Sequence, residues 1–285
     1  MNISIMDNNC ATNRATSRAG KQAGFTLVEL VMVIVVLGIL SLGSISFISN
    51  SAKGLVDTAE RQVLASSATI AVEKVLREVR RALPNSVRNF SDGGNACLEL
   101  VPILHSSEYV SIPTASDAAS FDSIQFFSAT GLESGFVAVY PSSLGSVYGT
   151  SPATPRAIST STAQAGVVGG PGPNMQTITF ASAATYRFPT GSPRKRFFLV
   201  GQPISFCDDA NGRLWRYQNY GFNVSSASSV PTSGSDRVLI ADSLAANSLQ
   251  FNITPAQLQR NAVVRMSVTI QRSSSSIEQV DISQE

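Results

Sequence analysis

Residues 24–48 read GFTLVELVMVIVVLGILSLGSISFI, and this stretch decides how the chain is organised. As a helix, residues 25–48 would span about 36 Å, enough to cross a hydrocarbon core of about 30 Å. The segment is apolar on every face, which few helices of soluble proteins are. The sequence therefore predicts a transmembrane helix over residues 25–48, with Glu29 as its single charged residue.

The polar segment before this helix sets its orientation. Residues 1–24 carry Arg14, Arg18 and Lys21 against Asp7. Basic residues at this end favour a cytoplasmic N-terminus. No small-residue cleavage pattern follows the apolar stretch closely, as it would after a secretory signal peptide. The segment therefore has the properties of a signal anchor, with the C-terminal part of the chain in the periplasm.

The carboxylate of Glu29 requires an explanation, because a charge near the end of a membrane helix is unfavourable and usually marks a function or a partner. No Lys or Arg within residues 25–48 can pair with it. Either Glu29 lies in the headgroup zone, or a cation comes from elsewhere. A cut between Gly24 and Phe25 would supply one in the new amine of Phe25.

The stretch from Lys21 through Gly24-Phe25-Thr26-Leu27-Val28-Glu29-Leu30 to Val31 resembles the processing motif of type IV prepilins. The resemblance implies a leader peptide, residues 1–24, that a prepilin peptidase/methyltransferase removes after Gly24, with N-methylation of Phe25. It implies that Glu29 is the assembly carboxylate, which faces the N-terminus of a neighbouring subunit. The implied partners are other major and minor pilins, the inner-membrane pilus assembly platform and the inner membrane itself. The leader is long for this family, which leaves Met6 open as the start.

Composition agrees with a membrane-anchored structural protein. Of the 285 residues, 43% are hydrophobic and only 14% are charged. Removal of the leader takes away three of the 21 basic and one of the 19 acidic side chains, which leaves 18 of each. The mature chain then has no formal net charge, so a nucleic-acid partner is not expected. About 200 residues after the long helix suffice for one substantial domain.

The helix is predicted to continue beyond the membrane as an amphipathic segment over residues 49–84. Apolar residues recur there at spacings of three and four, and charged residues occupy the other face. Pro84-Asn85 ends the pattern, which gives a helix of about 88 Å in all. Two separate helices broken near residues 50–54 are the alternative, since Gly43 and Gly54 weaken the helix. The apolar positions are Leu64, Ala68, Ala71, Val72, Val75, Leu76, Val79 and Leu83.

Residues 85–285 predict a β-rich head domain, so the fold class is α+β, with one mostly antiparallel sheet packed on the helix. Short β-rich runs are separated by turn residues, and SFCDDANGRLWRY (205–217) has the pattern of a hairpin. Residues 141–174, rich in Ser, Gly, Pro and Ala, predict a surface loop; a functional loop at a filament tip is the alternative. The predicted strands lie in residues 97–104, 123–128, 136–141, 175–180, 196–208, 213–222, 236–242, 248–254 and 262–272.

The three cysteines bear on whether the chain contains a disulfide. Cys10 lies in the leader, which leaves Cys97 and Cys207 for one disulfide in an oxidising periplasm, with two free buried thiols as the alternative. Two cysteines and the single His105 do not supply a metal-ligand quartet, so neither metal nor cofactor is predicted.

Catalytic residues are not predicted either. Catalysis by a nucleophile would depend on His105, the single histidine, whose neighbours Ser106, Ser107 and Glu108 have the pattern of ordinary loop residues after a strand. Asp208-Asp209 has the pattern of a solvated turn rather than a paired-carboxylate site. The chain carries none of the common nucleotide-binding, protease or esterase motifs. The sequence therefore predicts a protein that is not an enzyme.

A second resemblance refines the family. Residues 187–222, 72–88 and 135–141 resemble MshO-type minor pilins of the mannose-sensitive haemagglutinin (MSHA) pilus. This implies a low-abundance subunit of the inner membrane, later of the cell surface, that helps start or cap a pilus. A minor pseudopilin of type II secretion and a pilus-associated adhesin are the alternatives. The residues that would serve binding in an adhesin are Arg156, Arg194, Lys195, Arg196, Trp215 and Tyr217.

Overall fold

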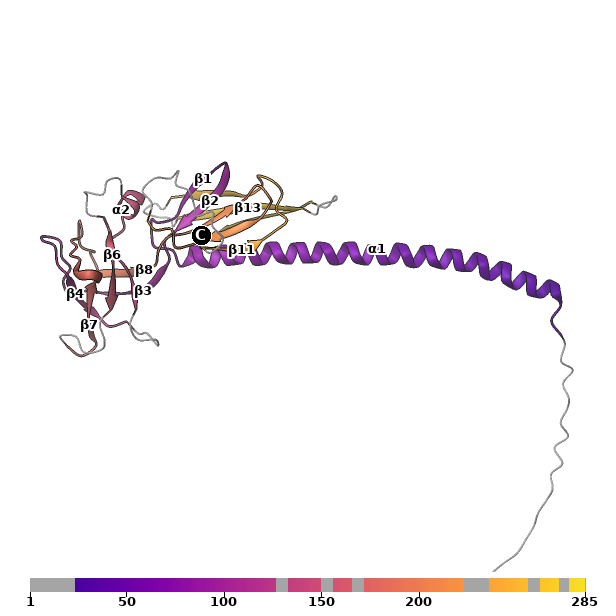
Figure 1. The fold of residues 1–285 in the computed structure, drawn as a ribbon, viewed down its shortest axis with the longest axis horizontal. Coiled ribbons are helices and arrows are strands. Elements are labelled where there is room, and N and C mark those ends of the chain that lie inside the picture. The colour runs from indigo at the N-terminus through magenta and orange to yellow at the C-terminus, as the bar shows by residue number, and fades with distance from the viewer. Residues whose placement is uncertain are drawn as a thin grey trace, which may run out of the picture. The chain divides into compact units, whose positions relative to one another are not determined.

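The computed structural model describes residues 24–126, 133–149, 156–165, 172–222, 236–255 and 262–271, and the backbone of residues 277–284. The chain divides into two compact units, Met1–Asp57 and Thr58–Glu285. Helix α1 (Leu27–Arg80) begins in the first unit and ends in the second. Figure 1 labels many of the elements that follow.

Helix α1 starts and ends where its sequence allows. At its start the Thr26 hydroxyl accepts a hydrogen bond from the Glu29 amide (3.3 Å), as a helix cap does. The helix runs without a break through residues 50–54, so the alternative of two separate helices is wrong. Its last turn tightens to i→i−3 hydrogen bonds ahead of Pro84, which cannot continue a helix.

The described strands of the second unit form three antiparallel sheets rather than the single sheet that the sequence predicted. The five-stranded sheet has the order β1-β2-β9-β10-β11, the three-stranded sheet β12-β13-β14, and the six-stranded sheet β3-β8-β5-β6-β7-β4. The bounds of the first two sheets are β1 (Arg88–Asp92), β2 (Asn95–Leu100), β9 (Ile204–Asp208), β10 (Leu214–Tyr217), β11 (Arg237–Ala241), β12 (Gln250–Thr254), β13 (Val263–Gln271) and β14 (Ile277–Gln284). Those of the third are β3 (Ile103–Glu108), β4 (Ser120–Ile124), β5 (Ser134–Val139), β6 (Ile158–Ala165), β7 (Met175–Phe180) and β8 (Arg196–Val200).

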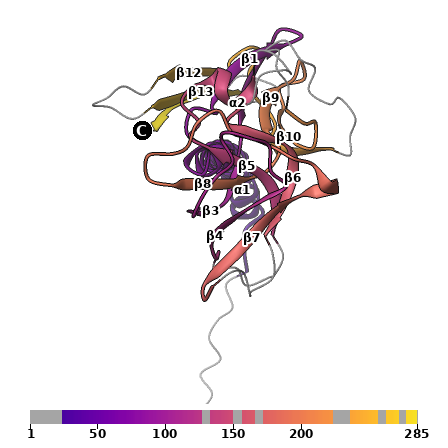
Figure 2. The same cartoon turned by 90° about the vertical axis from the view of Figure 1, so that its left-hand side faces the viewer.

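The end of α1 packs into the first two sheets, which confirms the predicted apolar stripe and the α+β class. Ala71, Val72, Val75 and Leu76 are buried in one core with side chains from both sheets. Figure 2 shows β12 and β13 to one side of α1 and β9 and β10 to the other. The strand residues of this core are Leu98, Leu100, Ile204, Phe206, Leu214, Ala241, Phe251, Val264, Met266 and Val268.

The six-stranded sheet encloses a second core and curls on itself. Its edge strands β3 and β4 meet just beyond the end of β3, where Tyr109 and Ser123 form a bridge and the Val110 amide donates to the Asp122 carbonyl (2.8 Å). Phenylalanines fill the interior, among them Phe121, which meets other rings of this core. The curled sheet thus forms a compact lobe with its own apolar centre.

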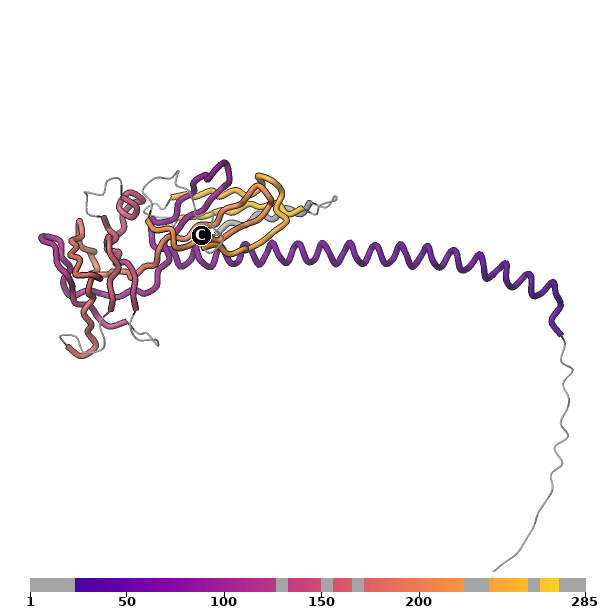
Figure 3. The backbone as a smooth tube through the Cα atoms, in the orientation of Figure 1, coloured from indigo at the N-terminus to yellow at the C-terminus, as the bar shows by residue number. Residues whose placement is uncertain are grey.

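The chain passes twice between the five-stranded and the six-stranded sheet, each time through a segment that contains a proline. The chain leaves the five-stranded sheet after β2 and enters the six-stranded sheet at β3; it returns between β8 and β9, as Figure 3 allows the reader to follow. The Gly201 amide donates to the Pro102 carbonyl (3.0 Å), so the two crossings lie side by side. The predicted strands 97–104 and 196–208 are therefore each two strands.

The prediction of a long surface loop over residues 141–174 is wrong for the described residues of this segment, which include a helix and a strand. Helix α2 (Leu144–Tyr148) starts at Ser143 in a capping box with Ser146, and β6 pairs with both β5 and β7. Tyr148 and Ile158 are buried at the junction of the lobes beside Leu83, which follows α1. Residues 150–155 and 166–171 of the predicted loop lie outside the described residues.

Candidate functional site

The segment that precedes α1 is open on all sides within the described chain. Gly24 is exposed, and a Cβ built there has no heavy atom within 4 Å. Phe25 is 79% exposed. Contacts within the described part of the chain therefore do not require a glycine at position 24.

Glu29 lies in the first turn of α1. A carboxylate there interacts favourably with the positive end of the helix dipole. Its own amide is held by the Thr26 hydroxyl. The position thus supports two roles for the carboxylate, stabilisation of the helix start and attraction of an external cation, which can be separated by experiment.

The first part of α1 presents an unbroken apolar surface. Every large apolar side chain from Phe25 to Ile48 is exposed, from Val31 at 45% to Leu27 at 79%. Among the described helices, α1 is long and apolar enough to span a membrane. A surface of this extent is stable only in lipid or against other helices, so the helix is consistent with membrane anchoring.

Cys97 and Cys207 lie opposite each other on the neighbouring strands β2 and β9. Their Cα atoms are 4.2 Å apart and the structure joins their sulfur atoms. Both side chains are buried on the face of the five-stranded sheet opposite to the helix core. Phe90 and Trp215 occupy the same cross-strand row, on β1 and β10.

His105 lies within β3, which extends to Glu108, so the loop predicted for its neighbours Ser106, Ser107 and Glu108 is wrong. Its Nε2 atom is 3.4 Å from Glu133 Oε2. Its ring stacks on Phe126 with the ring centroids 5.1 Å apart. These contacts give His105 a structural role on the sheet.

The prediction of a solvated turn at Asp208-Asp209 is wrong for Asp208 and right only in part for Asp209. Asp208 is 7% exposed and accepts a hydrogen bond from the Ala96 amide (2.7 Å). Burial raises the pKa of Asp208, against the effect of that amide.

Asp209 organises the β9–β10 hairpin. It accepts hydrogen bonds from the Trp215 indole (2.8 Å) and from the amides of Asn211 (2.9 Å) and Arg213 (3.0 Å). Partial burial disfavours its charge, but the indole, the two amides and the Arg213 charge outweigh that effect and lower the pKa of Asp209. The two neighbouring carboxyl groups are therefore structural and differ in environment.

This difference predicts opposite effects of amide substitution at neutral pH. Asp208→Asn keeps an acceptor for Ala96 and removes a buried charge, so stability should be unchanged or slightly higher. Asp209→Asn weakens three hydrogen bonds to a charged acceptor and should lower the free energy of unfolding by about 1 kcal/mol. Urea denaturation followed by the fluorescence of Trp215, the single tryptophan, measures both.

The pH dependence of the free energy of unfolding provides a control for the assignment of Asp208 and Asp209. The stabilisation from the lowered pKa of Asp209 is present above the usual carboxyl pKa of about 3.9 and disappears as pH falls through the lowered value. The raised pKa of Asp208 has the opposite sign, because its contribution is complete at low pH and is lost as pH rises through the raised value. Equal effects of both variants at pH 7 would contradict this assignment.

The residues considered for an adhesin are divided between two sheets. Arg156 precedes β6, and its guanidinium donates to the Tyr148 carbonyl (2.9 Å). The basic residues 194–196 are exposed at the start of β8 in the same sheet. Trp215 and Tyr217 belong to β10 of the five-stranded sheet, where Tyr217 is buried and the Arg237 guanidinium covers Trp215. Strand packing accounts for both aromatic residues.

Comparison with known proteins bears on the N-terminal segment. Residues 20–45 match the family model of the prokaryotic N-terminal methylation motif. No curated protein and no solved structure matches the chain significantly. The motif supports a type IV pilin-like or pseudopilin subunit, a structural rather than an enzymatic family. It implies processing by a prepilin peptidase and assembly with other pilins.

Proposed function

We propose that the chain is a minor pilin for biogenesis of a type IV pilus of the MSHA type, and that it initiates or caps the filament. The observation that carries this is the methylation motif at residues 20–45, which includes the start of an exposed apolar helix. The same helix ends in the core of a head domain. A chain built in this way can leave the membrane only if other helices replace the lipid around it.

Processing is the first step of the proposal. The prepilin peptidase cuts between Gly24 and Phe25 and methylates the new amine of Phe25. Residues 1–24 stay in the cytoplasm and the head is periplasmic, in keeping with the basic residues of the leader. The open surroundings of Gly24 support this step, because no described residue would contact a side chain at this position.

The proposed minor role rests on the resemblance of residues 72–88 and 187–222 to MshO-type minor pilins. These residues form the end of α1, the start of β1 and the β8–β9–β10 region. A pseudopilin of type II secretion would carry the same N-terminal motif. Deletion of the gene separates the two: loss of surface filaments with normal protein secretion supports the minor pilin, and loss of secretion with normal filaments supports the pseudopilin.

The processing step predicts a defined mature N-terminus. Intact mass spectrometry of protein from piliated cells should show a chain that starts at Phe25 with one added methyl group. Cells without the prepilin peptidase should contain the chain with its leader. A mature, assembled chain that keeps residues 1–24 would contradict the proposal.

Glu29 is proposed to dock the helix rather than to insert it. Insertion alone favours a neutral side chain, because a charge is costly in lipid. Among packed helices, attraction to the Phe25 amine of this or an adjacent subunit offsets desolvation and penalises a wrong axial register. Glu29→Gln and Glu29→Val should therefore leave membrane insertion and cleavage intact and reduce recruitment into the filament, measured as membrane fraction, processing and surface piliation.

Thr26→Ala is the matched control for the helix-capping role of this turn. It removes the hydrogen bond to the Glu29 amide and keeps the carboxylate, with a loss of about 1 kcal/mol in helix capping. Piliation should survive this change. Equal loss of piliation in Thr26→Ala and Glu29→Gln would assign Glu29 to helix capping, and normal piliation with both Glu29 variants would refute docking.

A further inference from the structure

Helix α1 carries exposed apolar side chains beyond its predicted transmembrane segment. Val63 and Ile70 are 67% and 52% exposed, and both belong to the unit Thr58–Glu285. Along the helix, Val63 follows Ile48 by about 22 Å, so lipid does not cover it when residues 25–48 span the membrane. Two such side chains are unfavourable in water, and covering them by a partner gains free energy.

The same row continues with basic residues toward the end of the helix. Lys74 and Arg77 are exposed, and so is Arg81, which follows directly after α1. Positions 63, 70, 74 and 77 lie within about 60° of one another around an α-helix. The outer stripe of α1 is therefore two apolar residues followed by three cations: Val63, Ile70, Lys74, Arg77 and Arg81.

The described part of the head does not cover or neutralise the outer stripe. Arg77 reaches Glu73 (3.2 Å), but the two side chains remain 71% and 68% exposed. Glu78 contacts Arg216 on β10 (3.5 Å) instead. The outer stripe thus keeps most of its positive charge. The residues of α1 that the sheets bury lie on another side of the helix: Ala68, Ala71, Val72, Val75 and Leu76.

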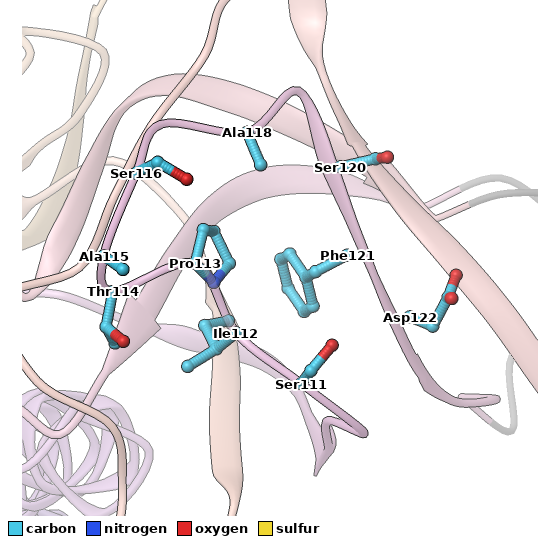
Figure 4. A pocket seen from close by; sticks show the side chains of 10 residues that line it. All are labelled: Ser111, Ile112, Pro113, Thr114, Ala115, Ser116, Ala118, Ser120, Phe121 and Asp122. Carbon is cyan, nitrogen blue, oxygen red and sulfur yellow. The ribbon is translucent and has the colours of Figure 1, made fainter.

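The hollow beside the connection from β3 to β4 offers no comparable surface. It has a volume of about 390 Å³, and Figure 4 shows the residues that line it. Phe121 is 5% exposed and belongs to the core of the curled sheet. The carboxylate of Asp122, on the opposite face of β4, accepts a hydrogen bond from the Thr177 hydroxyl (2.8 Å). The outer stripe is therefore the stronger candidate for a docking surface.

The charge of the outer stripe selects its partner. Opposite charges orient an interface, and like charges that meet there oppose it. A second copy of this chain, anchored by the same helix in the same membrane, would bring its three cations to the same height. The outer stripe therefore disfavours pairing between two copies and favours a different chain that carries carboxylates.

We propose that the outer stripe docks the helix of a different pilin, which presents apolar residues and, farther from the membrane, carboxylates. The occupant is specified by continuity, because α1 begins in the methylation motif that implies assembly with other pilins, and by charge complementarity. The inference rests on the proposed function and names the kind of subunit that α1 meets. It agrees with a minor role, since a chain that opposes its own copies does not polymerise by itself.

A charge-reversed copy of the chain can stand in for the acidic partner. The full chain is purified in a non-ionic detergent with a photo-crosslinking amino acid in place of Ile70. The variant Lys74→Glu/Arg77→Glu/Arg81→Glu keeps the apolar residue Val63 and inverts the basic residues. Mixed with the original chain, it should give at least about fivefold more crosslinked dimer than the original chain alone, and about 0.5 M salt should remove most of the difference.

Single variants provide the matched control. Lys74→Glu should increase mixed dimers about twofold or more, because it places a carboxylate within the outer stripe. Arg61→Glu makes the same change of charge at an exposed position about 160° from Val63 around the helix, and should leave dimer formation unchanged. Both positions are exposed, so the melting temperature of the head should stay the same in both variants. This pair decides the result even if the triple variant fails to fold.

Crosslinking from position 70 in piliated cells identifies the natural occupant. The crosslinked peptide should come from another chain, from the helix that follows its own N-terminal methylation motif, with Asp or Glu within about one helical turn. Replacement of those carboxylates by Lys should weaken the crosslink, and combination with the charge-reversed triple variant should restore it.

Crosslinks to a second copy, to lipid or to a chain without the motif would overturn the proposal, and so would equal dimer formation by Lys74→Glu and Arg61→Glu. The proposed function is tested separately, by the mature N-terminus and by surface filaments. Any of these contrary results from a processed chain in piliated cells would reject the inference and leave the proposed function standing.

Discussion

Replacement of both Cys97 and Cys207 by alanine is expected to lower the free energy of unfolding of the head domain by about 4–5 kcal/mol. The two residues are separated by 110 positions, and on the chain-entropy estimate a link that closes so long a loop removes much freedom from the unfolded chain. Because the link joins β2 to the central strand β9, its loss should destabilise the sheet that holds the helix core. We expect the urea midpoint reported by Trp215 fluorescence to fall accordingly.

Cys10→Ala is the matched control, because Cys10 lies in the proposed leader and its replacement should leave the stability of the mature chain unchanged. Thiol labelling of denatured, unreduced protein from the periplasm should modify neither Cys97 nor Cys207, and labelling after reduction should modify both. Full labelling before reduction would show that the two thiols are free in the cell. An unchanged urea midpoint in the double variant would show that the bridge adds little to stability.

Much of the architecture could be predicted because local patterns carry it. The apolar residues of α1 from Ala68 to Leu76 recur with the helical period, and they are the ones that the sheets bury. Strand β7 (Met175–Phe180) has the predicted bounds, since polar and apolar residues alternate over residues 177–180 and the turn residues 172–174 precede it. The hairpin at residues 205–217 followed from Asn211-Gly212, whose glycine has a φ of +69°.

The number of sheets could not be predicted, because alternation marks a strand without naming its neighbour. One signal was nevertheless present. Pro102 and Pro203 interrupt the predicted strands 97–104 and 196–208, and a proline is unlikely inside a central strand. Both positions are crossings from one sheet to the other. The strand β14 was missed, and so was β6 within the segment expected to be a loop, because its Ser, Thr and Ala residues have weak strand character.

The functional residues, too, include some that the sequence could predict and some that it could not. The N-terminal motif is contiguous, so Gly24, Phe25 and Glu29 could be chosen from sequence alone. The burial of Asp208 was missed because it depends on the Ala96 amide, from a strand more than a hundred residues away.

A buried ion pair was missed for the same reason, and it carries the last prediction. Arg88 and Glu99 face each other on β1 and β2 with side chains 11% and 2% exposed, and the Arg88 Nε atom donates to Glu99 Oε2. The Tyr220 hydroxyl donates to Glu99 Oε1 (2.9 Å). The Arg88 guanidinium lies 3.7 Å from the centre of the Tyr148 ring, which belongs to α2 at the junction of the lobes.

Glu99→Ala is expected to lower the free energy of unfolding by about 3–5 kcal/mol, because it leaves the Arg88 charge buried without its carboxylate. Replacement of both Arg88 and Glu99 by methionine should lower the free energy of unfolding less than Glu99→Met alone, since no buried charge then remains. The exposed pair of Arg77 and Glu73 on α1 provides the control: Glu73→Ala should change stability by less than about 0.5 kcal/mol. Trp215 fluorescence in urea reports all of these variants.

The single and double methionine variants of Arg88 and Glu99 form a double-mutant cycle. An ion pair predicts that their changes in the free energy of unfolding are not additive. If Glu99 contributed only through its volume, the double methionine variant would be destabilised by the sum of its two single variants. Because Arg88 also contacts Tyr148, loss of the pair should reach beyond the five-stranded sheet and loosen the junction with the curled sheet. Amide hydrogen exchange should then rise in α2 and at residues 136–139 of β5 in Glu99→Ala, and stay unchanged there in Glu73→Ala. A rise confined to β1 and β2 would show that the pair stabilises its own sheet and leaves the junction to the apolar contacts around Leu83 and Val200.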